Sequence, residues 1–491
     1  MHISEINLVN ESGIVRAEAQ LIWEEADKAP TSLFFEVDAQ FQDAFWADPN
    51  GFLMAAILPA WHAGEKRVKV DGALCPVLCN NLESSTRLLR SWYPELGSRP
   101  TIEPSQGFKT TLTFKAQAAS FLSCDIDSLS ILRWDRLHLP SDHPAAIRAA
   151  ITICSTESSD RTEEKASERA QKQILVASQV AADAKCDSVS IQTNIRQLDS
   201  DKLFYRHKWH GAVLAATGYF LGRYFGRFYV PASAVVPHLG PWGSHPMLDF
   251  WYSSAHVEFE HHGLNMSRSE KIEIVADWPV GLQNILVCQN NEHDKAGNCG
   301  ACEKCIGTMV GLEALGKLKG CQSFPVDEIT PELLSTLKEY SMDYDIGYYR
   351  GLMPLLAERG RDDLVEAIEQ LAGPHTGPPP KPTLTQQDVQ ELIPSGNTVI
   401  FAQEKGVRNV HGNFAGRRVL YWGPPSNDNI AIHELKSLRH AGGKFLVLRE
   451  PVLWWLDHYS DFHQHLREQF TCIAENERFA IFDLQERNEA S

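Results

Sequence analysis

The stretch Ala118-Ala-Ser-Phe-Leu-Ser-Cys-Asp-Ile-Asp-Ser128 gives the clearest indication of how this chain folds. Its first five residues are small or apolar and predict a buried strand, and the next residues predict a short turn that enters a helix. In such a turn, backbone N–H groups and the positive end of the helix point at one place, where an anion can bind. The stretch therefore predicts an anion-binding loop behind a core strand.

Strands and helices alternate around this loop, from about residue 111 to residue 325. Apolar runs predict strands, and longer amphipathic runs predict helices between them. Alternation of this kind is typical of an α/β fold in which helices cover both faces of a parallel sheet. The expected strands are 111–122, 149–154, 188–193 and 227–230, and the expected helices are 127–134, 163–185 and 203–225.

The loop resembles the pyrophosphate-binding loop of the N-type ATP pyrophosphatases (the PP-loop superfamily), whose pattern is Ser-Gly-Gly-x-Asp-Ser. Ser123, Asp127 and Ser128 match this pattern, while Cys124 and Asp125 replace both glycines. The order of elements over residues 111–320 and three further segments are similar to the 7-cyano-7-deazaguanine synthase family and its uncharacterised relatives. Those segments are Pro241-Trp-Gly-Ser-His-Pro246, Ser267-Arg-Ser-Glu-Lys271 and Asn298-Cys-Gly-Ala-Cys-Glu-Lys-Cys305.

The resemblance implies a parallel five-stranded sheet of the Rossmann-like (HUP) type and an ATP-dependent reaction assisted by Mg²⁺. A substrate oxygen would attack the α-phosphate of ATP, pyrophosphate would leave, and a nitrogen or sulfur nucleophile would displace the adenylate. Ligands of parallel sheets lie beyond the carboxyl ends of the strands. By position, the residues expected at the nucleotide are Ser123, Cys124, Asp125, Ile126, Asp127, Ser128, Cys154, Ser155, Thr156, Thr193 and Asn194.

Asp125 departs from the pattern where the backbone should approach pyrophosphate closely. Two like unit charges about 4 Å apart repel by roughly 4 kcal/mol at an effective dielectric constant near 20. Glycine also allows a closer approach than a residue with a side chain. Either Asp125 turns outward or binds the metal ion, or this loop no longer holds pyrophosphate well.

A second pattern is Cys288-(10 residues)-Cys299-Gly-Ala-Cys302-Glu-Lys-Cys305. Two C-x-x-C turns and an upstream cysteine have the spacing of a four-thiolate zinc site. Four sulfur ligands leave no position for water, so the zinc would be structural and not catalytic. A redox pair or a disulfide is the alternative interpretation of these cysteines.

Polar residues elsewhere supply candidates for catalysis beside Asp127 and Ser128. His245 and Asp249 follow a predicted strand and could bind substrate or transfer a proton, although Pro246 beside them is equally typical of a simple turn. Arg268 and Lys271 could neutralise a phosphate or carboxylate, or be ordinary surface charges. His261 and His262 lie in a polar stretch, where a second metal site is not favoured, and His210 has the pattern of a packed core histidine.

Composition narrows the class of protein. The chain has 491 residues and a formal net charge of −17, which argues against a broad nucleic-acid surface or an anionic membrane surface as partner. No run of 18 apolar residues and no basic segment followed by an apolar run is present, so no membrane span or signal peptide is expected. Seven cysteines outside the cluster are scattered, which is typical of a reducing compartment, and we expect a cytoplasmic protein.

The sequence predicts five segments. They are an α+β leader (1–110), the ATP-pyrophosphatase-like domain (111–325), a helical extension (326–372), a Pro-rich linker (373–385) and a small α/β module (386–491). Trp454 and Trp455 in the last module predict a core or an interface anchor, so this module is a candidate site for a protein or peptide partner. The sequence leaves a homodimer open.

Two classes of function follow from these observations. The first is an adenylating enzyme that activates a small carboxylate or carbonyl for attack by a nitrogen or sulfur nucleophile. The second is a degenerate nucleotide-binding scaffold that recruits a partner through the leader and the C-terminal module. A variant of the first aims the adenylation at a protein or peptide end.

Overall fold

The computed structural model describes residues 1–110, 117–155, 163–288, 297–339, 346–372, 392–394, 396–402, 418–449, 452–476 and 479–485. The chain divides into two compact units, Met1–Leu371 and Ala372–Ser491. The expected Pro-rich linker, 373–385, lies outside the described residues. Within the described part of the chain, no helix combines the length and the apolar character that crossing a bilayer requires.

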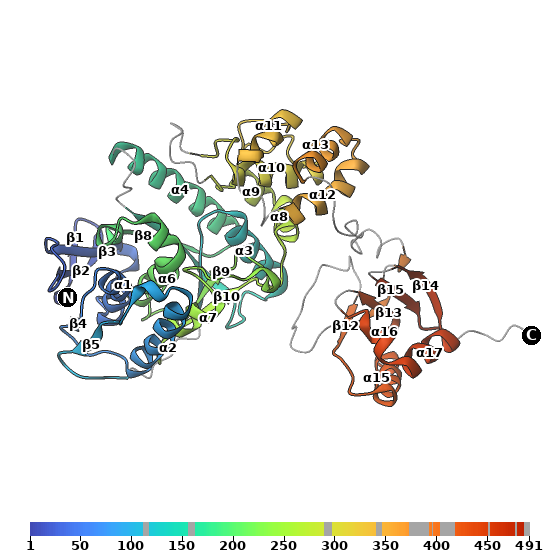
Figure 1. The fold of residues 1–491 in the computed structure, drawn as a ribbon, viewed down its shortest axis with the longest axis horizontal. Helices are drawn as coiled ribbons and strands as arrows, with labels where there is room; N and C mark the ends of the chain where they lie inside the picture. The colour runs from blue at the N-terminus through green and yellow to red at the C-terminus, as the bar shows by residue number, and fades with distance from the viewer. Residues whose placement is uncertain are drawn as a thin grey trace, which may run out of the picture. The chain divides into compact units, whose positions relative to one another are not determined.

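The first unit is an α/β structure (Figure 1). Its strands are β1 (His2–Glu11), β2 (Ile14–Ile22), β3 (Thr31–Asp38), β4 (Arg67–Val70), β5 (Thr101–Pro104), β6 (Ala118–Phe121), β7 (Ile147–Ser155), β8 (Asp187–Thr193), β9 (Arg227–Pro231) and β10 (Glu258–His262). Its helices are α1 (Pro49–His62), α2 (Pro76–Trp92), α3 (Ile126–His138), α4 (Glu163–Asp183), α5 (Lys202–Phe204), α6 (His210–Phe220), α7 (Pro246–Asp249), α8 (Arg268–Ala276), α9 (Pro279–Gln283), α10 (Glu303–Ala314), α11 (Pro331–Ser335), α12 (Ile346–Glu358) and α13 (Asp362–Ala372).

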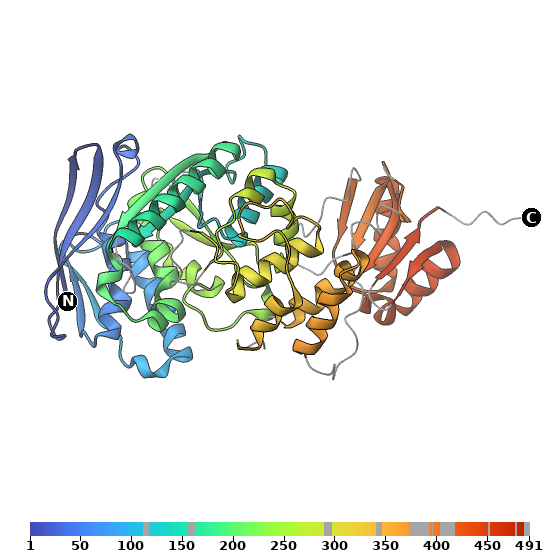
Figure 2. The same ribbon diagram turned by 90° about the horizontal axis from the view of Figure 1, so that it is seen from above.

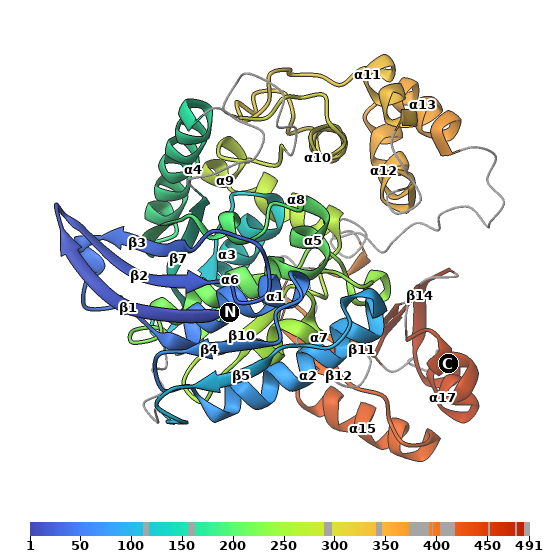
Figure 3. The same ribbon diagram turned by 60° about the vertical axis from the view of Figure 1, so that its left-hand side comes forward.

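All ten strands of this unit form one sheet, in the order β10-β9-β6-β7-β8-β3-β2-β1-β4-β5. The sheet is mostly parallel, and the expected mixed α/β architecture is confirmed. The five-stranded sheet is not found as a separate sheet, because β3 of the leader pairs with β8 and so adds five strands. That junction is antiparallel and pairs Phe35 with Thr193 and Glu36 with Gln192. Figure 2 shows the leader strands in blue at one end of the unit, and Figure 3 shows β1, β2 and β3 side by side.

The strand order creates a switch point next to β6. The chain passes from β6 outward to β7 and β8, and then returns to the other side of β6 to form β9 and β10. At such a reversal the segments that follow the two central strands run to opposite sides and leave a crevice beyond their carboxyl ends. The segments after Phe121 and Pro231 therefore border the place where a ligand of such a sheet binds.

Alternate residues of the central strands face two different cores. Ala119 and Phe121 of β6 belong to a core with α1 and α6, whereas Ala118 belongs to a core with α3, α4 and α10. In β7, Ile151 faces the first core and Ala150 the second. Helices thus cover both faces of β6 and β7, which explains why these two strands have buried apolar residues on both faces.

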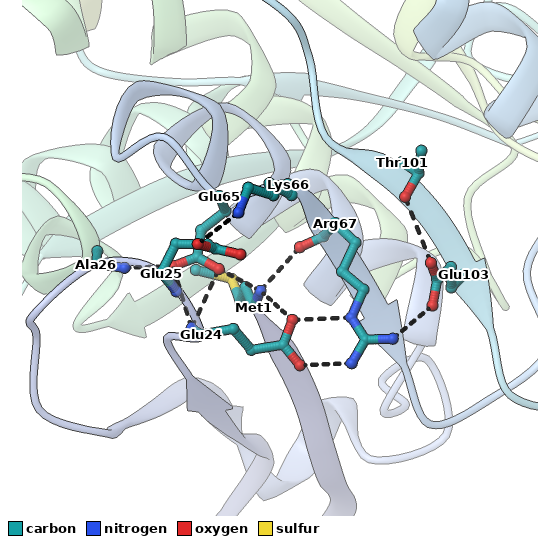
Figure 4. A network of polar contacts seen from close by, with 9 residues as sticks. All are labelled: Met1, Glu24, Glu25, Ala26, Glu65, Lys66, Arg67, Thr101 and Glu103. Carbon is teal, nitrogen blue, oxygen red and sulfur yellow. Dashed lines mark hydrogen bonds and ion pairs between the residues drawn. The ribbon is translucent and has the colours of Figure 1, made fainter.

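The α-amino group of Met1 is bound inside a network of charged residues in the leader (Figure 4). The α-amino group of Met1 donates hydrogen bonds to Glu65, to Glu24 Oε2 at 3.1 Å and to the carbonyl of Arg67 at 2.8 Å. Arg67 binds both carboxylate oxygens of Glu24 at 2.9 Å, and this hydrogen bonding holds the pKa of Glu24 at about 2. The buried ammonium group is therefore neutralised, and β1 is tied to the start of β4.

The second unit contains a five-stranded sheet in the order β12-β11-β13-β15-β14. Trp455 is fully buried in its core against Trp422, and Trp454 is 40% exposed. Its elements are β11 (Thr398–Ala402), β12 (Arg418–Trp422), α15 (Asp428–His440), β13 (Gly443–Arg449), α16 (Trp454–His458), α17 (Ser460–Gln469), β14 (Thr471–Glu475) and β15 (Phe479–Asp483).

Candidate functional site

The loop between β6 and α3 lies at the switch point. Leu122 continues the sheet by donating its N–H to Ile151 O at 2.8 Å, and the chain then turns at Cys124, which has a φ of +62°. This left-handed conformation favours glycine, yet a cysteine stands at this position. The Cys124 side chain is buried, and burial raises its pKa to about 12. Cys124 is therefore a structural thiol and not a reactive thiolate.

Two serines meet across the loop. Ser123 is exposed, and its hydroxyl lies 3.3 Å from that of Ser128. Ser123 Oγ also accepts the N–H of Asp125 at 3.3 Å, and Ser128 Oγ donates to the carbonyl of Asp125 at 3.0 Å. The two hydroxyl groups that the sequence assigns to phosphate binding thus stand together at the start of α3.

The carboxylate of Asp125 is turned toward two cations and not into open solvent. Lys304 Nζ lies 2.7 Å from Oδ2, and an Arg268 guanidinium nitrogen lies 3.4 Å from Oδ1. Burial alone raises the pKa of Asp125, but the charges of Lys304 and Arg268 outweigh it and bring the pKa to about 2. Asp125 is therefore an anion at neutral pH, held beside the loop where a phosphate is expected.

Asp127 forms the second half of this charge network. Lys271 Nζ lies 3.1 Å from Asp127 Oδ1 and also donates to the carbonyl of Ala232, in the segment that follows β9. Arg268 reaches Asp127 Oδ2 at 3.6 Å. Lys271 is 1% exposed, so its ammonium group is held in place by these oxygens on both sides of the switch point.

The segment Ser267-Arg-Ser-Glu-Lys271 begins helix α8, and its own residues explain why the helix begins there. Ser267 Oγ accepts the N–H of Glu270, and the Glu270 carboxylate accepts the N–H of Ser267, which is a capping box at the start of α8. The cap fixes the first turn of α8, and Arg268 and Lys271, one turn apart, then point at the two aspartates. Three cations and two carboxylates leave one net positive charge at the amino end of α3.

The residues expected on the adenosine side are largely engaged with the protein itself. Cys154 is buried near the end of β7, and burial raises its pKa to about 11. Thr193 Oγ1 donates to Phe34 O at 2.7 Å, and Asn194 Oδ1 accepts the N–H of Phe34 at 2.9 Å. These two side chains therefore fasten β3 of the leader to the end of β8. Ser155 ends β7, and Thr156 lies outside the described residues.

The four clustered cysteines come together as the sequence predicts. Their sulfur atoms all lie within 4.8 Å of one another, and no disulfide joins cysteines among the described residues. Cys299 Sγ lies 3.9 Å from Cys305 Sγ, and Cys302 Sγ lies 3.9 Å from Cys288 Sγ. Sulfur atoms at the corners of a zinc tetrahedron are about 3.8 Å apart. The four cysteines are thus arranged so that they could hold one metal ion.

The cysteine cluster is connected to the loop. Lys304, which binds Asp125, lies between Cys302 and Cys305 in the sequence. Leu286, two residues before Cys288, donates its N–H to the carbonyl of Cys124 at 2.8 Å. The segment that carries the four cysteines (residues 286–305, here called the metal-site segment) therefore contacts the loop twice. Leu286 binds the loop backbone, and Lys304 binds Asp125.

His245 and Asp249 lie at the two ends of the short helix α7. His245 Nδ1 accepts the N–H of Met247 at 3.1 Å, so this histidine caps the helix and leans edge-on against Trp92. Asp249 Oδ2 accepts the Ser244 hydroxyl at 2.9 Å and lies 2.6 Å from His261 Nδ1. No sequence pattern joins Asp249 to His261, because the histidine lies on β10, a strand made of mostly polar residues.

His210 precedes Gly211, the residue that packs against the Asp249 carboxylate. Burial lowers the pKa of His210, and the negative charge of Asp249 opposes this shift. Comparisons with known proteins add nothing to this geometry, since no family model, no curated protein and no solved structure matches the chain.

Proposed function

We propose that this chain binds ATP with Mg²⁺ at the loop Ser123–Ser128 and adenylates a small carboxylate or carbonyl substrate. The observation that supports it is the convergence of Arg268, Lys271 and Lys304 on the amino end of α3, at the switch point of the sheet. A parallel sheet with cations gathered at that position is suited to a polyanionic ligand.

Each residue then has a chemical task. The hydroxyls of Ser123 and Ser128 and the N–H groups at the start of α3 would hold the pyrophosphate oxygens. Arg268 and Lys304 would neutralise the charge that develops on the leaving pyrophosphate, and Asp127 would hold Mg²⁺ with Lys271 orienting it. A substrate oxygen forms the bond to the α-phosphorus, the bond to pyrophosphate breaks, and pyrophosphate leaves with the electron pair.

The cysteine cluster has a structural role in this proposal. Four thiolates at tetrahedral spacing suit zinc, and they fill its coordination sphere, so no site remains for a reacting water. The ion would hold Lys304 and the 286–288 segment against the loop.

The test is binding of ATP with Mg²⁺ by calorimetry, together with release of pyrophosphate in the presence of small carboxylates. Arg268→Gln and Lys304→Gln should each weaken ATP binding by roughly 10- to 100-fold, because each removes a charged hydrogen bond of about 1.5–3 kcal/mol. Lys317→Gln is the matched control, since the partner of Lys317 among the described residues is the exposed Asp277 at 3.0 Å. Equal affinity in all four proteins would contradict the proposal.

One observation favours the degenerate scaffold as a second function. Asp125 already pairs with both Arg268 and Lys304, so a phosphate must compete with a carboxylate that belongs to the chain. If the wild type neither binds ATP nor releases pyrophosphate, and Asp125→Gly restores ATP binding, the chain is a scaffold. If the wild type releases pyrophosphate, it is an enzyme.

A further inference from the structure

Asp249 and His261 form a buried pair beside the loop. The two atoms that face each other, Asp249 Oδ2 and His261 Nδ1, are 2.6 Å apart, and the two side chains are 1% and 5% exposed. Ser244 donates its hydroxyl to the same Oδ2 at 2.9 Å, so the carboxylate is oriented from a second direction. This is the arrangement of a histidine held by a carboxylate.

The contact determines which nitrogen of His261 is available. A carboxylate accepts hydrogen bonds, so Nδ1 carries a proton, and in the neutral imidazole the lone pair is then on Nε2. Among the described residues, the hydrogen bond found for the His261 ring is the one through Nδ1, and none is found for Nε2. Asp249 therefore leaves His261 with one uncommitted basic nitrogen.

The backbone around the Asp249 carboxylate is closely packed. Asp249 Oδ1 is buried and has no hydrogen-bond partner among the described residues. Gly211, at the start of α6, lies against it: a Cβ on this residue would stand 2.5 Å from Oδ1 and 2.6 Å from the carbonyl of Gly243. A buried carboxylate oxygen without a hydrogen-bond partner destabilises the fold, so this position is not explained by stability alone.

The pair lies at the same edge of the sheet as the anion-binding loop. Ser120 pairs with Tyr229 on β9, and Tyr229 pairs with Glu260 on β10. His261 is thus one residue nearer the carboxyl edge than Ser120 and two strands away, which is about 10 Å.

Other histidines of this region have different contacts. His245 uses Nδ1 to cap α7. His262 points to the opposite face of β10, where it contacts Trp134 and Tyr229 and binds Glu260 Oε1 at 3.0 Å. His256 has its Nδ1 3.2 Å from the Ser254 hydroxyl and lies 3.7 Å from Asp48. Of these histidines, His261 is the one whose Nδ1 is held by the buried carboxylate of Asp249.

We propose that His261 is the general base of the acyl-transfer step and that Asp249 is its positioning residue. This inference rests on the proposed function. Ammonia or a primary amine attacks the carbonyl carbon of the acyl adenylate, the C–N bond forms, and the C–O bond to AMP breaks with its electron pair leaving on AMP. The proton lost by the nitrogen passes to His261 Nε2.

The first experiment reads the imidazole directly, by ¹⁵N NMR of the full chain labelled at histidine, with His261→Gln to assign the signals. The expected result is a proton on Nδ1 and none on Nε2 of His261, and loss of that preference in Asp249→Asn. A proton on Nε2 in the wild type would overturn the inference, and so would an unchanged tautomer in Asp249→Asn.

The second experiment measures access to Nε2 by modification with diethyl pyrocarbonate and peptide mass spectrometry, with and without saturating ATP and Mg²⁺. His261 should be modified in the free protein, and the adduct should be lost when nucleotide is bound. His262 is the matched control and should be modified in both conditions. An unreactive His261, or one modified equally while calorimetry shows that ATP is bound, would overturn the inference. If ATP does not bind, the proposed function fails, and the tautomer and the reactivity of His261 still decide whether it is a held base.

Discussion

The ammonium group of Lys304 lies 2.7 Å from the carboxylate of Asp125, although the two residues are 179 positions apart in the chain. Lys304 stands between two cysteines of the metal-site segment, and Asp125 stands at the amino end of α3. This contact joins the loop at the switch point to the cysteine cluster. The negative charge of Asp125 therefore contributes to the free energy of unfolding of the first unit.

Acid should therefore weaken the first unit through Asp125. Its pKa of about 2 is below the ordinary value of 3.8, so its ion pairs stabilise the fold fully above about pH 4 and are lost as the pH falls toward 2. The loss should be about 2 kcal/mol in the free energy of unfolding, measured by urea titration between pH 2 and 7. Glu24 acts in the same range, so the quantity to compare is the difference between wild type and Asp125→Asn. Asp277→Asn is the control, and an equal pH dependence in wild type and Asp125→Asn would contradict the assignment.

Replacing Lys271 should strongly destabilise the first unit, because it leaves the buried carboxylate of Asp127 without its nearest cation. Removing one member of a buried ion pair costs about 3–5 kcal/mol, and Lys271→Met should lower the free energy of unfolding by that amount. The double variant Lys271→Met with Asp127→Asn should recover part of the loss, since it removes the unpaired charge. Lys317→Met, in an exposed pair, should change stability by less than about 1 kcal/mol. A small effect of Lys271→Met would show that water reaches Asp127 freely.

The cysteine cluster predicts a metal content. The purified chain should carry one zinc ion, and Cys302→Ser should lose it, as measured by elemental mass spectrometry. Cys472→Ser, which changes a cysteine of the second unit, should keep the ion. Because the metal-site segment positions Lys304 and the Cys124 carbonyl, a chelator should also lower the melting temperature of the first unit. A chain without metal that melts at the same temperature would contradict the structural role.

Gly211 should not tolerate a methyl group. A Cβ there meets Asp249 Oδ1 and the carbonyl of Gly243 at 2.5 and 2.6 Å, so Gly211→Ala should cost about 1–3 kcal/mol, even though alanine is the better helix former. Gly351→Ala in α12 is the matched control, because no atom lies within 4 Å of its added Cβ. It should stabilise the first unit by about 0.5–1 kcal/mol. Chemical denaturation of both variants gives the comparison, and equal effects would mean that α6 can move away from α7.

Local sequence patterns were enough to predict much of the fold. The apolar strands near 149–154, 188–193 and 227–230, the long helix after residue 163 and the spacing of the four cysteines all depend on neighbouring residues in the sequence, and each appears in the structure. The strand β10 could not be predicted in this way. Glu258-Phe-Glu-His-His262 contains one apolar residue, and it becomes a strand because its backbone pairs with β9.

Contacts between distant residues could not be derived from the sequence. A glycine position filled by Asp125 left three outcomes open, and only the fold brings Lys304 and Arg268 to that carboxylate. For the same reason His261 was not recognised as the partner of Asp249, since that contact depends on the register of β10. The roles of His245, Arg268 and Lys271 at a bound nucleotide stay predictions.

The pairing of β3 with β8 has one more consequence. A shortened chain that begins near residue 111 would keep the loop between β6 and α3 and the cysteine cluster, yet it would leave β8 with an unpaired hydrogen-bonding edge at Gln192 and Thr193. Unprotected edges of this kind recruit strands from other molecules. A truncated protein that lacks the first hundred residues should therefore be insoluble, because those residues cover an edge that would otherwise pair with other molecules.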